Sequence, residues 1–198
     1  MKKLLISVVV IFALLFSVNV QAGQPLGLPR AWLAQPNSRA FGMSLDGWME
    51  AWVRWLENGA DPDARIGNVA FLPIFPGPQF SVDIKVGTAL VLPVATWLGT
   101  EPDYSDMAPD DWFGDSDHIF GTLQLDGGKV IEINENYYVG PTYYDPPAIL
   151  FETNIYFTQA LACVILPLPP GVHELILHSE FVDFGIAFDN TWTITVVP

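Results

Sequence analysis

The sequence predicts a mainly β protein, an antiparallel β-sandwich of jelly-roll-like form with one amphipathic, tryptophan-rich helix packed on it. Two observations lead to this fold class. Residues 69–197 hold about eight to ten apolar or alternating segments at short intervals marked by turn residues, which is typical of sandwiches and jelly rolls. Residues 44–59 alone, after the N-terminus, show helical spacing of apolar side chains. So much aromatic surface on one short helix needs a large partner, and the strands supply it.

The N-terminus has the pattern of an export signal. Lys2 and Lys3 precede an apolar run over residues 4–18, and Val20-Gln21-Ala22 fits a small-x-small cleavage site. The run is shorter than the roughly 20 residues that span a bilayer, which favours a cleaved signal over a membrane anchor. We therefore expect residues 1–22 to be removed and residues 23–198 to form a single β-sandwich domain, periplasmic or extracellular.

The charge balance limits the partners. Without Lys2 and Lys3 the chain keeps six basic residues against 22 acidic ones, a net charge of −16. Such a chain repels nucleic acid and anionic membranes, so we expect neither nucleic-acid binding nor stable membrane insertion after signal cleavage. Cations, neutral glycans and basic proteins are better partners, although the charge could serve solubility alone. Cys163, the sole cysteine, lies in an apolar run and is expected to be buried and inert.

The predicted helix has a clear start, stripe and end. Ser44 is a plausible N-cap and Gly59 a stop, while Glu50 and Arg54 stand four residues apart in the favourable order. Residues 23–41 form an irregular lead-in. Six apolar side chains recur at three- and four-residue steps and share one face: Leu45, Trp48, Met49, Trp52, Trp55 and Leu56.

The strands that follow differ in exposure. Residues 69–75 form a short strand that Pro73 marks as an edge or bulge. Residues 80–86 alternate between apolar and polar and are half-buried, whereas residues 88–97 are apolar on both faces and form an inner strand with a bulge at Pro93. Further strands are expected at residues 149–157, 160–166, 172–181, 184–188 and 191–197, the last two separated by a turn at Asp189-Asn190.

Two predicted loops carry the polar chemistry. Residues 101–121 hold seven carboxylates with prolines and a glycine between them, and residues 136–147 hold two tyrosine pairs and three prolines. Between these loops, residues 123–133 form a hairpin through Asp126-Gly127-Gly128.

Four segments carry a resemblance: residues 47–73 (GWMEAWVRWLENGADPDARIGNVAFLP), 86–94 (VGTALVLPV), 166–181 (LPLPPGVHELILHSEF) and 191–198 (TWTITVVP). In this order they resemble a loosely defined group of small exported bacterial β-sandwich proteins of uncharacterised function. That group often has a pair of cysteines around the G-x-V-x-F-L strand, and this chain has none there. The resemblance implies export and a sandwich fold, and it implies no activity.

The acidic loop is a candidate calcium site. Ca²⁺ takes six to eight oxygen ligands, and carboxylates on flexible loops supply them. The spacing is not that of an EF-hand, because Ile119 occupies the fifth position of a loop that starts at Asp115. The alternative is that these carboxylates are solvated. The candidate ligands are Asp110, Asp111, Asp115 and Asp117. No cofactor is required, and Ca²⁺ is an optional ligand.

The aromatic residues of both loops are candidates for glycan binding. An aromatic face stacks on the apolar face of a sugar ring while carboxylates accept hydrogen bonds from its hydroxyls. The alternative is that the rings cap the ends of the core. The candidate residues are Tyr104, Trp112, Tyr137, Tyr138, Tyr143 and Tyr144.

Catalysis has less support in the sequence. The three histidines, His118, His173 and His178, belong to no catalytic motif, and the last two are five residues apart on opposite faces of a strand. We therefore expect a non-catalytic protein that binds a glycan or another surface component. The alternatives are a secreted polysaccharide hydrolase using Asp115 and Asp117, and a structural envelope or matrix protein.

Overall fold

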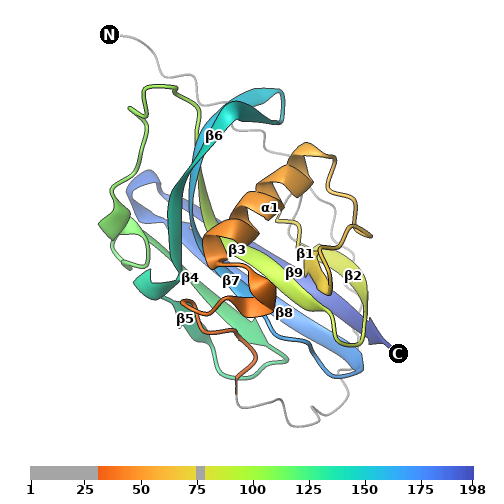
Figure 1. Cartoon of the computed structure of the whole chain (residues 1–198). Helices are drawn as coiled ribbons and strands as arrows, with labels where there is room; N and C mark the ends of the chain where they lie inside the picture. The colour runs from red at the N-terminus through yellow and green to blue at the C-terminus, as the bar shows by residue number, and fades with distance from the viewer. Residues whose placement is uncertain (1–30, 75–78) are drawn as a thin grey trace.

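The computed structural model describes residues 31–74 and 79–198. Within these ranges the protein is mainly β, with nine strands in two sheets and one α-helix (Figure 1). The predicted signal peptide, residues 1–22, lies outside the described residues, as does the start of the lead-in. Among the described residues, no helix has the length and apolar character that crossing a membrane requires.

The helix forms where the sequence predicts it. Helix α1 spans Leu45–Glu57, and the Ser44 hydroxyl caps it by accepting a hydrogen bond from the Gly47 amide at 3.3 Å. The predicted pairing of Arg54 with Glu50 was wrong. Arg54 instead binds Glu57 at 2.8 Å, and the other carboxylate oxygen of Glu57 accepts a bond from the Ile149 amide at 2.9 Å. Glu57 therefore links the helix to the sheet beside it.

The strands form two sheets of mixed direction. The first sheet has the order β1 (Val69–Phe71), β3 (Ala89–Gly99), β7 (Thr153–Ile165), β6 (Tyr138–Leu150). The second has the order β2 (Gln79–Lys85), β9 (Ile186–Val197), β8 (Gly171–Phe181), β4 (Ile119–Leu125), β5 (Ile131–Ile133).

The prediction of purely antiparallel sheets was wrong at two strand pairs. Strands β1 and β3 are parallel, and so are β2 and β9. After β1 the chain continues to β2 in the second sheet and then returns to the first sheet as β3. Because it crosses between the sheets twice, β3 starts at the same end of the first sheet as β1 and runs parallel to it. Each parallel pair lies at the edge of its sheet.

Several strand boundaries also differ from the prediction. Most of the predicted tyrosine loop belongs to β6, an edge strand that tolerates its prolines through two breaks in its register with β7. Strand β7 runs without the predicted interruption before Ala160, and the predicted turn at Asp189-Asn190 lies inside β9. The bulge at Pro93 and the hairpin between β4 and β5 are confirmed.

The first sheet is the middle of three layers (Figure 1). Its inner face packs against the second sheet in one hydrophobic cluster, which includes Leu92 and Cys163 from the first sheet and Leu177 and Trp192 from the second. Its outer face packs against α1. This position explains why β3 and β7 are apolar on both faces, as the inner-strand pattern of residues 88–97 predicts.

All three helical indoles are buried, and each N–H has a backbone acceptor. Trp48 donates to the Ala40 carbonyl at 2.8 Å, Trp52 to Leu72 at 2.9 Å, and Trp55 to Asp61 at 2.7 Å. The predicted tryptophan stripe is thereby confirmed, because the indoles bury their rings without leaving a polar group unpaired.

Candidate functional site

The acidic loop between β3 and β4 is held by side chains from the middle sheet. Gln159 of β7 is fully buried; its amide oxygen accepts a bond from the Ala108 amide at 3.1 Å, and its nitrogen donates to the Ala108 carbonyl at 2.8 Å. The Trp97 indole donates to the Asp106 carbonyl at 2.7 Å. The loop is irregular in backbone but fixed in position, since the buried Gln159 and the half-buried Trp97 bind it at two points.

Two of the six candidate tyrosine and tryptophan residues meet as an exposed pair. The rings of Tyr104 and Tyr143 lie edge to face with centroids 4.7 Å apart, and they are 41% and 51% exposed. Both rings also contact the buried ring of Phe157, at 5.7 Å and 6.3 Å. Because Phe157 supports them from below, they present a fixed aromatic surface to the solvent.

The other three tyrosines have different roles. The Tyr138 hydroxyl donates a hydrogen bond to the Asp110 carboxylate at 2.6 Å. The pKa of Tyr138 is raised, and burial of its ring is the main cause. Tyr144 is buried under the helix, where Arg54 lies 5.2 Å from its ring and burial raises its pKa to about 12. Tyr137 lines a groove beside Gln35 and Asn134. Among the described residues, none of these three rings is in contact with the ring of Tyr104 or Tyr143.

Trp112 forms a second aromatic surface with a histidine. Its indole stacks on the His118 ring with a centroid distance of 4.9 Å and an angle of 9°. The His118 Nδ1 atom lies 2.7 Å from an Asp183 oxygen, and this hydrogen bond is the main reason that the His118 pKa is raised; Asp115 and Asp117 add to it. No local pattern in the sequence points to Asp183 as the partner of His118, because the two residues are 65 positions apart in the chain.

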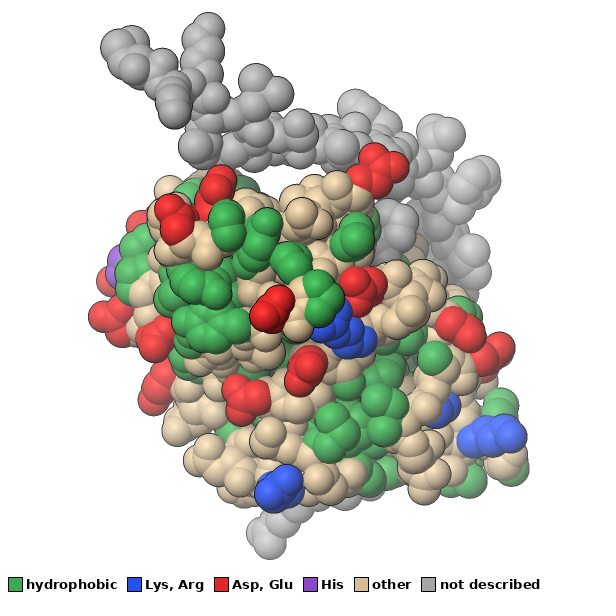
Figure 2. Space-filling model, turned by 45° about the horizontal axis from the view of Figure 1, so that its top comes forward, with side chains coloured by type: hydrophobic (Ala, Val, Ile, Leu, Met, Phe, Trp, Pro, Cys, Tyr) green, Lys and Arg blue, Asp and Glu red, His purple; other side chains and the backbone are tan. Residues whose placement is uncertain are grey.

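The segment after β8 adds exposed aromatic side chains that the sequence analysis did not assign to a site. Residues 182–188 follow β8 and include Phe184 and Phe188, which are 48% and 43% exposed. The ring centroid of Phe184 lies 5.4 Å from that of Trp97. We use the name aromatic belt for six side chains that form three groups: Tyr104 with Tyr143, Trp112 stacked on His118, and Trp97 with Phe184 and Phe188, which meet around Phe181. Figure 2 shows hydrophobic side chains gathered with carboxylates around them, on the side where a histidine is visible.

Two of the four candidate calcium ligands, Asp110 and Asp115, accept hydrogen bonds from different groups. Asp110 binds Tyr138 and Gln159, and Asp115 accepts a bond from the Asp117 amide at 2.8 Å. Asp111 and Asp117 are exposed. Within the part of the chain that the structure describes, no group of three or more His, Cys, Asp or Glu side chains is placed to hold a metal ion. The calcium site stays a prediction.

The other two histidines bind carboxylates as well. His178 binds Asp189 and Glu180 through its two ring nitrogens, both at 2.8 Å, and these bonds raise its pKa. His173 is buried and binds Asp126 at 2.8 Å, which fixes the turn between β4 and β5. The two histidines lie on opposite faces of β8, as predicted. Cys163 is buried, and burial raises the pKa of its thiol, which keeps it protonated and inert.

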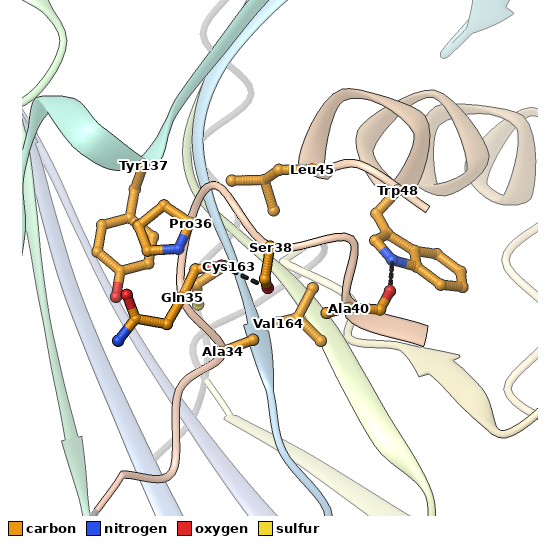
Figure 3. Close-up of a pocket in the computed structure, with 10 residues that line it drawn as sticks. All are labelled: Ala34, Gln35, Pro36, Ser38, Ala40, Leu45, Trp48, Tyr137, Cys163 and Val164. Atoms are coloured by element: carbon orange, nitrogen blue, oxygen red, sulfur yellow. Dashed lines mark hydrogen bonds between the residues drawn. The ribbon is translucent and has the colours of Figure 1, made fainter. Parts of the chain in front are cut away.

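A small cavity lies between the segment before the helix and β7 (Figure 3). Its volume is about 10 Å³, and its lining includes Gln35, Trp48, Tyr137 and Cys163. A space of this size holds about one water molecule. The cavity is therefore a packing defect rather than a ligand site, and the segment 34–40 lies close against the body of the protein.

No protein-family model matches this chain, and no curated protein matches it. The functional argument consequently rests on the side chains themselves. The predicted resemblance to exported β-sandwich proteins stays a prediction.

Proposed function

We propose that this protein is an exported, non-catalytic binding module that takes up a glycan, or another surface component that carries sugar, through the aromatic belt. The observation that carries the proposal is the exposed pair of Tyr104 and Tyr143. Aromatic faces stack on the apolar faces of sugar rings, and exposed carboxylates such as Asp103, next to Tyr104, and Asp183, beside His118, provide acceptors for the sugar hydroxyls.

The support beneath the pair favours binding, because rigid rings lose little conformational entropy when a ligand arrives. Phe157 lies on Gly99, where an added Cβ atom would come within 1.9 Å of the ring. Only glycine leaves room for the ring at this position. The aromatic surface is thus formed before any ligand binds.

The proposal includes the finer fold prediction, a jelly-roll-like sandwich whose connecting loops gather at its ends and contact ligands. It also includes export, which depends on residues 1–22 and is tested by sequencing the N-terminus of the secreted protein. A mature N-terminus at Gly23 is the expected result.

A glycan array followed by titration tests the binding. We expect a saturable glycan ligand whose affinity falls at least tenfold in Tyr143→Ala and in Trp112→Ala, while Tyr156→Ala, a half-buried tyrosine outside the belt, leaves it unchanged. Running each titration with Ca²⁺ and with EDTA tests the calcium prediction in the same experiment. An array without any hit under either condition supports the structural envelope or matrix role instead.

The alternative enzymatic function has a direct test. A polysaccharide hydrolase using Asp115 and Asp117 would release reducing ends, and the turnover would disappear in Asp115→Asn or Asp117→Asn. Turnover that these variants abolish would contradict the non-catalytic proposal. We expect none, because Asp115 is already engaged by the Asp117 amide in a local turn.

A further inference from the structure

A groove of about 740 Å³ lies between residues 31–37 and the hairpin of β4 and β5 with the short turn after it, η3 (Glu135–Tyr137). This volume is within the range of roughly 300 to 1,000 Å³ that is typical of sites for small ligands. The groove lies apart from the aromatic belt, since none of the belt residues lines it.

The lining of this groove departs from the composition of the chain. The chain carries 22 acidic residues, yet no described residue that lines the groove is acidic. One basic side chain, Lys129, lines it, and within the described residues Lys129 has no salt bridge. The remaining polar side chains are neutral amides: Gln35, Asn37, Asn134 and Asn136. The described lining of the groove therefore holds no carboxylate that would repel an anion, and it holds one cation.

Both walls of the groove are held in place. On one side, the Ala34 amide donates to the Val164 carbonyl at 2.8 Å, and the Trp32 carbonyl accepts from the Leu166 amide at 2.8 Å. On the other side, Gln124 donates to the Gly128 carbonyl at 2.8 Å, which fixes the backbone next to Lys129.

The amide groups of the groove are positioned as well. The Asn134 side-chain oxygen accepts bonds from the Asn136 amide and side chain at 3.1 and 3.2 Å, so the Asn134 side-chain nitrogen is left to donate. The Gln35 carbonyl accepts from the Ser38 hydroxyl at 2.6 Å, which fixes the turn that carries the Gln35 side chain (Figure 3). Donors and acceptors held in this way suit the hydroxyls of a sugar.

We propose that this groove is a second binding site, and that its ligand is a saccharide bearing a carboxylate, such as a uronic acid. Lys129 pairs with the carboxylate in a charge-assisted hydrogen bond, the amides bind the hydroxyls, and Ile131 and Tyr137, which are both half-buried, contact the apolar face of the ring. The proposal is independent of glycan binding at the aromatic belt, because it depends on a different set of residues.

Calorimetric titration of the mature protein with trigalacturonate tests the proposal, with its methyl ester as the neutral counterpart. We expect saturable binding of the acid, and binding of the ester that is at least tenfold weaker. Lys129→Gln should weaken binding of the acid at least tenfold, because the charge-assisted bond is lost. Lys85→Gln, which removes a basic residue on β2, and Tyr143→Ala, which alters only the belt, should leave it unchanged. Thermal unfolding shows whether each variant is folded.

Three results would overturn the proposal: equal affinity for the acid and its ester, an unchanged affinity in folded Lys129→Gln, or no saturable binding at millimolar ligand. Binding that Tyr143→Ala abolishes and Lys129→Gln leaves intact would also overturn it, because the ligand would then occupy the belt. The belt proposal can fail by itself. In that case Lys129→Gln would weaken binding of trigalacturonate, while Tyr143→Ala and Trp112→Ala would change the affinity for no glycan.

Discussion

The indole of Trp52 joins the helix to the middle sheet in two ways. It is 1% exposed, so nearly its whole ring is packed, and its N–H donates to the Leu72 carbonyl in a buried hydrogen bond. Trp112 offers the contrast, since its ring lies partly in solvent at the molecular surface. The same residue type thus serves the core in one position and the surface in the other.

Trp52→Ala should lower the free energy of unfolding by about 3 to 5 kcal/mol, because it leaves a cavity and an unpaired carbonyl. Trp52→Phe should cost less, since it keeps part of the ring. Urea denaturation measures both, and Trp112→Ala, as the control, should cost less than Trp52→Ala, because the Trp112 ring is only half-buried at the edge of the core. A Trp52→Ala cost as small as that of the control would mean that the helix stripe is not packed.

Two glycines give opposite expectations for the same substitution. Gly99→Ala places a Cβ atom 1.9 Å from the Phe157 ring and should destabilise by about 1 to 3 kcal/mol. Gly47→Ala lies in the helix, where the nearest atom is the flexible end of Met43 at 3.3 Å, and should stabilise by up to about 1 kcal/mol. Melting temperatures that move in the same direction would contradict this reading of the two sites.

For single residues, the sequence predicts which side chains are buried better than it predicts which residues they contact. The helical period places Trp48, Trp52 and Trp55 in the core correctly. It does not assign faces to Tyr143, which is exposed, and Tyr144, which the helix buries, because the prolines of residues 136–147 predict a loop, and a loop has no alternation of faces. Local pattern does not show which face each tyrosine of such a strand occupies.

Among the secondary-structure elements, strands β7 and β9 show why boundaries were missed. Thr158-Gln159 and Asp189-Asn190 are polar pairs inside apolar segments, which resembles a turn in a single sequence. In the folded chain Gln159 binds Ala108, 51 residues away, and Asp189 binds His178 on the neighbouring strand. The partners that make these polar residues compatible with a strand are distant in sequence.

Gln159→Leu tests whether one side chain positions the acidic loop. The substitution keeps the volume roughly constant but leaves the amide and carbonyl of Ala108 unpaired, which should cost about 2 to 5 kcal/mol. Limited proteolysis with mass spectrometry should show faster cleavage within residues 100–118. Gln124→Leu is the matched control, because among the described residues its side chain makes a single, exposed hydrogen bond, to the Gly128 carbonyl. Equal cleavage in both variants would mean that Gln159 does not hold the loop.

Across the whole molecule, the layer order was predictable and the strand directions were not. A segment that is apolar on both faces needs cover on both sides, which predicts β3 as an inner strand between the helix and the second sheet. Parallel pairing of β1 with β3 and of β2 with β9 depends on which sheet each strand enters, and hydrophobic period carries no information on that choice. The groove was also missed, since residues 31–37 and 125–137 meet only in the folded chain.

The histidines make the stability of the whole molecule depend on pH in a defined direction. The pKa of His118 is raised chiefly by Asp183, and that of His178 by Asp189 and then Glu180. A histidine whose folded pKa lies above its unfolded value of about 6.5 stabilises the protein fully below that pH, and this contribution is lost as the pH rises through the folded pKa. The free energy of unfolding should therefore fall between pH 6 and pH 9. Tyr144, with its pKa raised to about 12, stays protonated throughout this window.

Urea denaturation at pH 6, 7, 8 and 9 measures this fall, and the double variant His118→Gln with His178→Gln should remove most of it. Glu57 and Asp103 do not change the slope between pH 6 and pH 9. Their pKa values are lowered, so the stability that they contribute is lost only as the pH falls into the acidic range. Raised salt should reduce the pH dependence in the parent protein, since both histidines are partly exposed and their ion pairs are screened. A double variant that retains the full slope would place its source in other groups, and the histidine–carboxylate pairs would then contribute little to the folded state.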